Sequence, residues 1–164
     1  MSEQHETYEK LIGLLDERGA VYRVIEHPAE GATEAVSALR GNTPAQAAKC
    51  IVVMVKTGKK TKRHVLAVVP GDRRVDLGAV KALLGGGYAG FATPEVAERL
   101  AGSVSGTILP FSFDPELELV VDPALLEQEE LFFNAARLDR SLALRTADYV
   151  AIAEPRTEPI AQAV

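Results

Sequence analysis

Two features of the sequence could do chemistry. The first is Lys49, which stands at the start of the apolar run 50–55. An ammonium there either extends along its stem to reach water or faces a cleft, where it could hold a phosphate or carboxylate. The second is the loop Gly102–Phe111, rich in glycine and serine and fixed at one end by Pro110. Its backbone amides could bind an oxyanion or a carbonyl, although many connecting loops have a similar composition.

A basic run lies between two apolar stretches, at residues 56–64. Its five cationic side chains are Lys56, Lys59, Lys60, Lys62 and Arg63. The run is either a solvated hairpin turn or a loop that contacts the phosphates of a nucleic acid. The net charge of −5 does not indicate a general nucleic-acid binder, so any such contact is local.

Other reaction chemistry has weaker support in the sequence. His5, His27 and His64 are scattered, and no metal-ligand spacing occurs, so no metal is expected. No nucleophile-elbow pattern is present. His27, at the end of an expected strand, could equally be structural or catalytic. Cys50 is the only cysteine, and its apolar neighbours indicate a buried, inert thiol.

The composition bounds the class of protein. The chain has 164 residues, of which 47% are hydrophobic and 25% charged, as expected for one globular domain. The acidic N-terminus does not resemble a signal peptide, and no apolar stretch could span a bilayer. With its single cysteine, the chain is expected to be cytoplasmic, with no membrane partner.

Hydrophobic periodicity and capping residues predict alternating helices and strands that would position these groups. The expected helices cover 8–15, 33–40, 77–84, 94–100 and 147–153. The expected strands cover 21–26, 50–56, 64–69, 118–121, 131–134 and 141–144. Thr43-Pro44-Ala45-Gln46 is a capping-box pattern that leads into Lys49. The fold class is therefore α+β: one domain, 1–154, with a central mixed, mostly antiparallel sheet surrounded by helices, and a flexible tail, 155–164.

An ordered set of short motifs covers the chain from Tyr22 to Ala153. The motifs are Glu26-His27-Pro28, Thr33-Glu34-Ala35, Ala47-Ala48-Lys49-Cys50, the run Val65 to Gly71, the GxxxP loop Gly106 to Pro110, Phe133-Asn134-Ala135 and Thr146-Ala147-Asp148-Tyr149. Together they resemble the family of YbaK-like proteins and the inserted editing domain of bacterial prolyl-tRNA synthetases. Ser112, Ala136 and Ser141 depart from the family pattern, which more often has glycine at the first two positions and an acid near the third.

The resemblance implies a free-standing aminoacyl-tRNA deacylase. Such an enzyme hydrolyses the ester of mischarged tRNA in trans, here expected to be Ala-tRNA(Pro) or Cys-tRNA(Pro), without a metal or other cofactor. Lys49 and Gly106 would form the catalytic centre. The residues expected to bind the aminoacyl end are His27, Thr33, Thr107, Pro110, Asn134 and Ser141.

The same resemblance implies the partners. These would be mischarged tRNA, contacted weakly by the basic run 56–63, and prolyl-tRNA synthetase as a protein that presents the tRNA, with no role for DNA. The protein would be a monomer or a homodimer. The alternative is a non-catalytic module that binds an amino-acid-like ligand or a synthetase.

Overall fold

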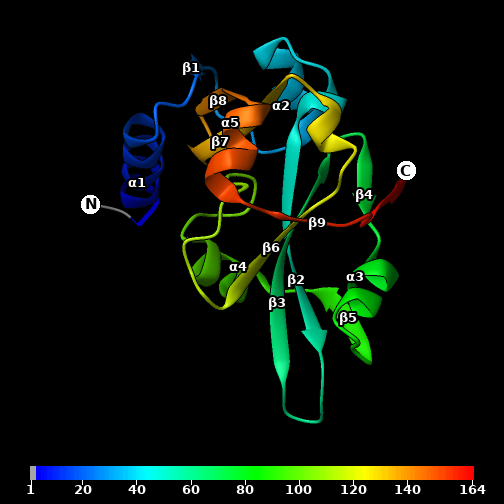
Figure 1. Ribbon diagram of the computed structural model, residues 1–164. Coiled ribbons are helices and arrows are strands. Elements are labelled where there is room, and N and C mark those ends of the chain that lie inside the picture. The colour runs from blue at the N-terminus through cyan, green and yellow to red at the C-terminus, as the bar shows by residue number, and fades with distance from the viewer. Residues whose placement is uncertain (1–2) are drawn as a thin grey trace.

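A long antiparallel hairpin organises the fold of this computed structural model, which describes residues 3–164, with side chains from Glu6 onward (Figure 1). The hairpin consists of β2 (Ala48–Lys56) and β3 (Lys62–Pro70), paired from Ala48↔Pro70 to Lys56↔Lys62. Both strands are rich in β-branched residues, which favour the pleated conformation. The tip of the hairpin projects beyond the rest of the molecule.

The hairpin is the centre of a five-stranded mixed sheet in the order β5-β2-β3-β6-β9. β5 (Tyr88–Phe91) pairs antiparallel with β2 and forms one edge. β6 (Leu117–Val121) runs parallel to β3, and β9 (Arg156–Thr157) runs parallel to β6. The predicted α+β class is confirmed, although the strands are divided among three sheets.

The second sheet is three-stranded and antiparallel, in the order β1-β8-β7. It contains β1 (Tyr22–Glu26), β7 (Glu130–Arg137) and β8 (Arg140–Arg145). A single parallel bridge, Ala47↔Phe132, joins it to the start of β2. This bridge brings β7 beside the residues that precede Lys49.

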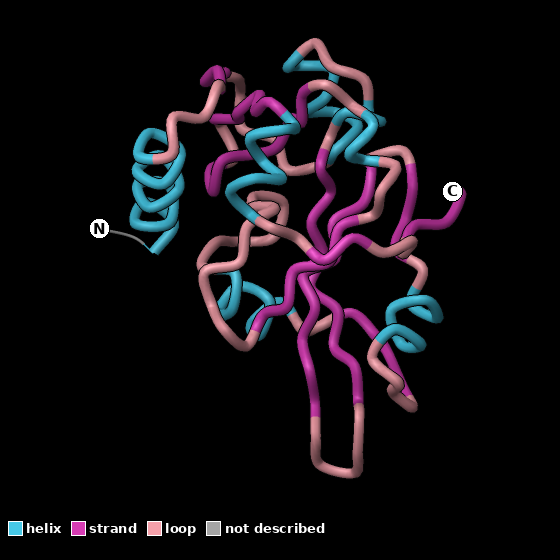
Figure 2. Tube along the Cα trace, in the orientation of Figure 1, coloured by secondary structure: helices cyan, strands magenta, loops and turns pink. Residues whose placement is uncertain are grey.

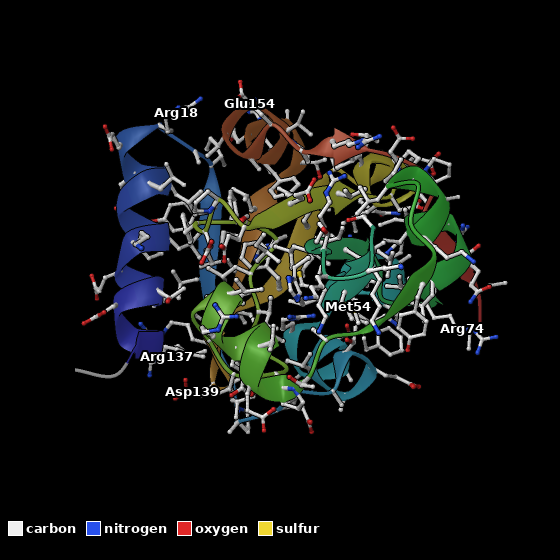
Figure 3. The ribbon with its side chains drawn as sticks, turned by 90° about the horizontal axis from the view of Figure 1, so that it is seen from below. Arg18, Met54, Arg74, Arg137, Asp139 and Glu154 are labelled. Atoms are coloured by element: carbon white, nitrogen blue, oxygen red, sulfur yellow. The ribbon has the colours of Figure 1, made fainter. Side chains whose placement is uncertain are left out.

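Within residues 3–164, five helices surround the sheets, whose arrangement the tube view shows (Figure 2). They are α1 (Glu3–Glu17), α2 (Thr33–Arg40), α3 (Leu77–Leu83), α4 (Pro94–Ala101) and α5 (Thr146–Ala153), with 3₁₀ turns η1 (Pro44–Gln46) and η2 (Leu125–Glu127). α1 lies against β7. The turn between β7 and β8 carries the Arg137–Asp139 ion pair, whose two side chains lie together in Figure 3.

The two faces of the hairpin belong to different hydrophobic cores. Val52, Leu66 and Val68 pack with α1 and the three-stranded sheet. Val53, Val65 and Val69 pack with α3, β4 (Arg73–Val75) and Ile160. Because side chains alternate along a strand, neighbouring residues of β2 face different cores.

Two local signals between α2 and β2 are confirmed. Thr43 and Gln46 form the predicted capping box at η1, immediately before β2. Gly41 follows α2 at φ +78, a left-handed conformation that glycine adopts without strain. The capping box and this glycine fix the path from α2 to Lys49.

Residues 155–164 differ from the expected flexible tail. They form β9 and β10 (Ala161–Ala163), and β10 pairs antiparallel with β4. The Asp122 carboxylate, itself buried, accepts hydrogen bonds from the amides of Ile160 (2.9 Å) and Ala161 (2.8 Å). Ile160 is only 1% exposed. Its burial and these two hydrogen bonds stabilise the segment, although its small residues and prolines had predicted a frayed end.

No helix within residues 3–164 is long and apolar enough to cross a membrane.

Candidate active site

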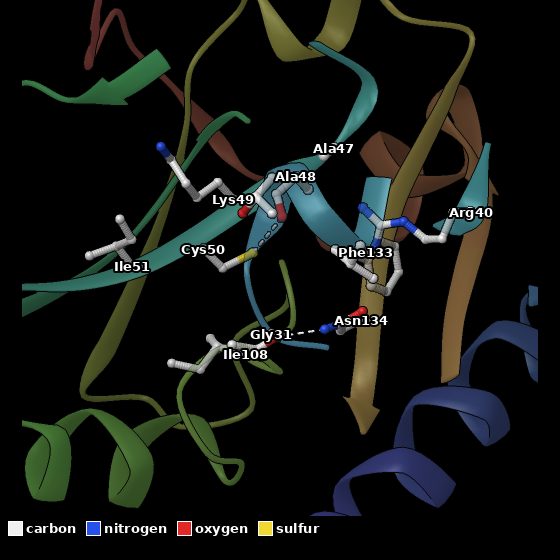
Figure 4. Close-up of a pocket in the computed structure, with 13 residues that line it drawn as sticks. Gly31, Arg40, Ala47, Ala48, Lys49, Cys50, Ile51, Ile108, Phe133 and Asn134 are labelled. Carbon is white, nitrogen blue, oxygen red and sulfur yellow. Dashed lines mark hydrogen bonds between the residues drawn. The ribbon is translucent and has the colours of Figure 1, made fainter. Parts of the chain in front are cut away.

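A cavity of about 200 Å³ lies where four elements meet, and Lys49 and Gly106 both line it (Figure 4). The elements are the start of β2, the helix α2, the loop 102–114 and β7. The lining contains no carboxylate and two cationic residues, Arg40 and Lys49. A site of this composition favours an anion or a carbonyl oxygen that gains negative charge.

Lys49 lines the cavity, and its ammonium is directed away from Asn134 in Figure 4. Burial lowers the pKa of Lys49, and the charge of Asp72 partly offsets this. The side chain therefore stands at the rim, where its long stem can bring the charge to a bound phosphate.

Arg40 is the second cation of the cavity, and the sequence analysis did not select it. Burial lowers the pKa of Arg40 to about 10, so it remains charged at neutral pH. No described carboxylate pairs with it: Nε donates to Asn42 Oδ1 (3.0 Å) and Nη1 to Ser141 Oγ (3.2 Å). Thr33, Val36 and Arg40 line the cavity at helical spacing, so the periodicity of α2 could have identified Arg40.

Gly106 has a backbone conformation that requires glycine. Its φ is +90, and a Cβ at this position would lie 3.1 Å from Cα of Gly31 and 3.3 Å from its carbonyl oxygen. Two loops thus cross backbone to backbone at the cavity. The amides of Gly106 and Ile108, both lining residues, have no hydrogen-bond partner among residues 3–164. Such amides could stabilise a developing oxyanion.

Asn134 fastens the two loops together. Its Nδ2 donates to the carbonyl oxygens of Gly106 (2.8 Å) and Glu30 (2.9 Å). Its Oδ1 accepts from the hydroxyl of Ser141 (2.9 Å). The predicted residues Asn134 and Ser141 are therefore brought together, with Asn134 at the cavity and Ser141 fully buried behind it.

His27 lies outside the cavity lining and contacts Ser141. Its Nε2 is 2.7 Å from Ser141 Oγ, and its Nδ1 is 2.8 Å from the carbonyl oxygen of Pro28. A carbonyl only accepts, so the contact with Pro28 is a hydrogen bond in the tautomer that carries a proton on Nδ1. His27 therefore contacts Ser141, and Ser141 in turn bonds Asn134 at the cavity.

Thr33, Thr107 and Pro110 have different surroundings. Thr33 lines the cavity. Thr107 is 1% exposed, and its hydroxyl donates to the carbonyl of Val104 (2.7 Å). The carbonyl of Pro110 accepts from the Tyr149 hydroxyl (2.7 Å). Thr107 and Pro110 therefore hold the loop in shape, and neither lines the cavity.

The basic run lies at the far end of the hairpin from Lys49. Lys56 follows Lys49 by seven positions in β2, a distance of roughly 23 Å along a strand. Arg63 is already paired with Glu118, its Nε donating to Oε2 at 2.8 Å. Lys56, Lys59, Lys60 and Lys62 are thus not part of the cavity, and a tRNA contact by them stays a prediction.

Cys50 lines the cavity but is not expected to act as a nucleophile. Burial raises the pKa of its thiol far above the usual value, which removes the reactive thiolate at neutral pH. We therefore expect Cys50→Ala to retain deacylation within a few-fold of wild type in a steady-state assay. Cys50→Ser is the companion variant of similar size, and a large loss in both variants would contradict this expectation.

Replacing Asn134 with alanine should loosen the loop crossing. The carbonyls of Glu30 and Gly106 would lose their donor, and a typical intramolecular hydrogen bond contributes about 0.5–1.5 kcal/mol. We expect a lower urea midpoint together with a lower kcat. Unchanged stability would show that water replaces the amide at both carbonyls.

Among the described residues, no group of three or more His, Cys, Asp or Glu side chains is placed to hold a metal ion.

Comparison with known proteins identifies the family. The model of the aminoacyl-tRNA editing domain matches residues 27–152, which include the cavity. The chain belongs to this family. The resemblance inferred from the motifs is confirmed, and membership makes the protein a hydrolase of the aminoacyl-tRNA deacylase class.

A curated relative has high similarity over most of the chain. The multifunctional Ser/Thr-tRNA deacylase ProXp-y of Escherichia coli K12 is 46% identical over 150 residues, which cover 91% of this chain and 89% of that protein. The O157:H7 strain of the same species has a protein with the same name and the same identity.

Two solved structures share the fold. The crystal structure of a hypothetical protein superposes with a TM-score of 0.83 at 21% identity, covering 93% of this chain and 99% of that one. A protein described as a candidate trans-editing enzyme for prolyl-tRNA synthetase gives a TM-score of 0.78 at 24% identity, covering 95% and 97%.

Proposed function

We propose that the protein hydrolyses the ester of Ser-tRNA and Thr-tRNA in trans. The observation that carries this proposal is the cavity itself, where unpartnered amides of Gly106 and Ile108 adjoin two cations and no carboxylate. The choice of amino acid is supported by the 46% identical relative, which is named a Ser/Thr-tRNA deacylase. The Ala-tRNA(Pro) or Cys-tRNA(Pro) specificity expected from the sequence stays a competing prediction.

The reaction would use water as the attacking group. Water adds to the ester carbonyl, and the negative charge that develops on the carbonyl oxygen is stabilised by the amides of the loop. The bond to the ribose oxygen then breaks, that oxygen takes up a proton, and a free amino acid and a free tRNA 3′ end are released. Lys49 would hold the terminal phosphate, so that binding energy orients the ester.

A hydroxylated amino acid suits the polar side of the cavity. The Thr33 hydroxyl, and the N–H groups of Arg40 that do not bond Asn42 or Ser141, can exchange hydrogen bonds with a substrate hydroxyl. A site that bonds a hydroxyl discriminates strongly against an analogue that lacks it, because its own polar groups are then left unpaired. This argument favours serine and threonine over alanine.

A panel assay tests the proposal. The protein is incubated with Ser-, Thr-, Ala- and Cys-tRNA carrying labelled amino acids, and the loss of label is followed beside spontaneous hydrolysis. We expect Ser-tRNA and Thr-tRNA to be consumed fastest. Preferential consumption of Ala-tRNA(Pro) or Cys-tRNA(Pro) would overturn the specificity. Thermal stabilisation by an aminoacyl ester analogue without turnover of any ester would indicate a binding module instead.

A further inference from the structure

A second cavity, of about 310 Å³, lies on the sheet edge beside the active site. Its apolar side consists of Met54, Phe91 and Val96, and its basic side of Lys62, His64 and Arg99. No carboxylate lines it. We name this the edge groove.

The edge groove neighbours the active-site cavity through an intermediate cavity. An intermediate cavity of about 200 Å³ shares Gly106 and Ile108 with the active site, and it shares Phe91 and Ala92 with the edge groove. The three cavities therefore follow one another from Lys49 and Gly106 to the edge strand β5. A chain that enters the active site by its end can continue into this groove.

Phe91 is the most exposed aromatic residue that lines these cavities, with 60% of its surface accessible. Among the described residues it makes no ring–ring or cation–ring contact. Tyr88, on the same strand, differs because Lys56 Nζ lies 5.4 Å from its ring centroid. A free ring face is available to stack on a flat partner.

The charges of the edge groove favour an anionic partner. Lys62 and Arg99 are cationic, and desolvation lowers the pKa of His64, which these two charges lower further. Glu116 acts on His64 in the opposite direction but does not line the groove. Positive charge beside an exposed aromatic ring is the pattern that binds single-stranded nucleic acid, through the phosphates and a stacked base.

We propose that the edge groove binds the single-stranded 3′ end of the tRNA, with Phe91 stacking on a base upstream of the aminoacylated nucleotide. This rests on the proposed deacylase function, because the terminal nucleotide must occupy the adjoining cavity. The succession of neighbouring cavities favours this occupant over a protein partner or a second copy of the chain.

The test compares two substrates of different length. One is a seryl-tRNA, and the other is seryl-adenosine, which carries only the terminal nucleoside. One base stack is worth about 1–3 kcal/mol, so Phe91→Ala should raise KM for the tRNA by roughly 5- to 150-fold. The variant should leave kcat for the tRNA, and kcat/KM for seryl-adenosine, within two-fold of wild type.

Tyr88→Ala is the matched control, because Tyr88 is a similarly exposed aromatic residue of the same strand that does not line the groove. This variant should leave KM and kcat for both substrates unchanged. Arg99→Gln should raise KM for the tRNA. It should also make binding less dependent on salt, by the amount expected for the loss of about one phosphate contact. Phe91 is exposed, so its truncation should not impair folding, which thermal melting verifies.

Three outcomes decide between the hypotheses. An equal effect of Phe91→Ala on both substrates, or no effect, overturns the edge-groove proposal while the deacylase function stands. A change in oligomeric state on size-exclusion chromatography also overturns it, in favour of a second copy at β5. If the wild-type protein hydrolyses neither substrate, nor any other ester in the panel, the proposed function itself fails.

Discussion

Replacing Lys49 with alanine is expected to lower kcat/KM for aminoacyl-tRNA by about 100-fold or more. The ammonium stands at the rim of a cavity with no carboxylate, and we infer that it holds the terminal phosphate of the substrate. A small displacement of a reacting group can cost about 100-fold in rate, so the loss of this contact should act through orientation as well as binding. Single-turnover deacylation measures the effect.

Two further variants separate the charge from the stem. Lys49→Met keeps the apolar stem and removes the ammonium, so it should be as inactive as the alanine variant. Lys81→Ala removes an exposed lysine in the last turn of α3 and should behave as wild type. Substantial activity in Lys49→Met would show that the charge is dispensable and would refute the phosphate-holding role.

Gly106→Ala is expected to abolish most activity and to destabilise the protein. A left-handed φ costs a non-glycine residue about 1–2 kcal/mol, and the new Cβ would press on the backbone of Gly31 at 3.1 Å. The loop must move to relieve this contact, which displaces the amides of Gly106 and Ile108. We expect a lower free energy of unfolding by about 1–3 kcal/mol, measured in urea, and a fall in kcat greater than that in KM.

Gly13→Ala is the matched control for this substitution. Gly13 lies within α1, no atom lies within 4 Å of its added Cβ, and its φ is not left-handed. Alanine there should raise the free energy of unfolding by about 0.5–1 kcal/mol and leave activity unchanged. If Gly106→Ala were equally harmless, the crossing with Gly31 would not be needed for catalysis.

The sequence predicted those elements whose signals are local. The helix 33–40 agrees residue for residue with α2, because Gly41 ends it sharply. The hairpin strands are long and β-branched and were also predicted. The strands β4, β5, β9 and β10 were missed, since they are two to four residues long and depend on partners distant in sequence.

The site was predicted in part, for a similar reason. Lys49, Gly106, Thr33 and Asn134 line one cavity as expected, because the motifs that carry them are short and ordered. The roles of Thr107 and Pro110 in holding the loop, and the position of Ser141 behind Asn134, depend on tertiary contacts that no spacing reveals. The parallel bridge between Ala47 and Phe132, which assembles the cavity, joins segments 85 residues apart.

The contact between Ile160 and the second core has a consequence for the order of folding during synthesis. Ile160 is buried with Val53, Val65 and Val69 of the hairpin, and its amide is held by Asp122. The hairpin leaves the ribosome long before Ile160 does, so the core on this face of the central sheet lacks one of its members while translation continues. Only after residue 160 has emerged can the core on that face be completed.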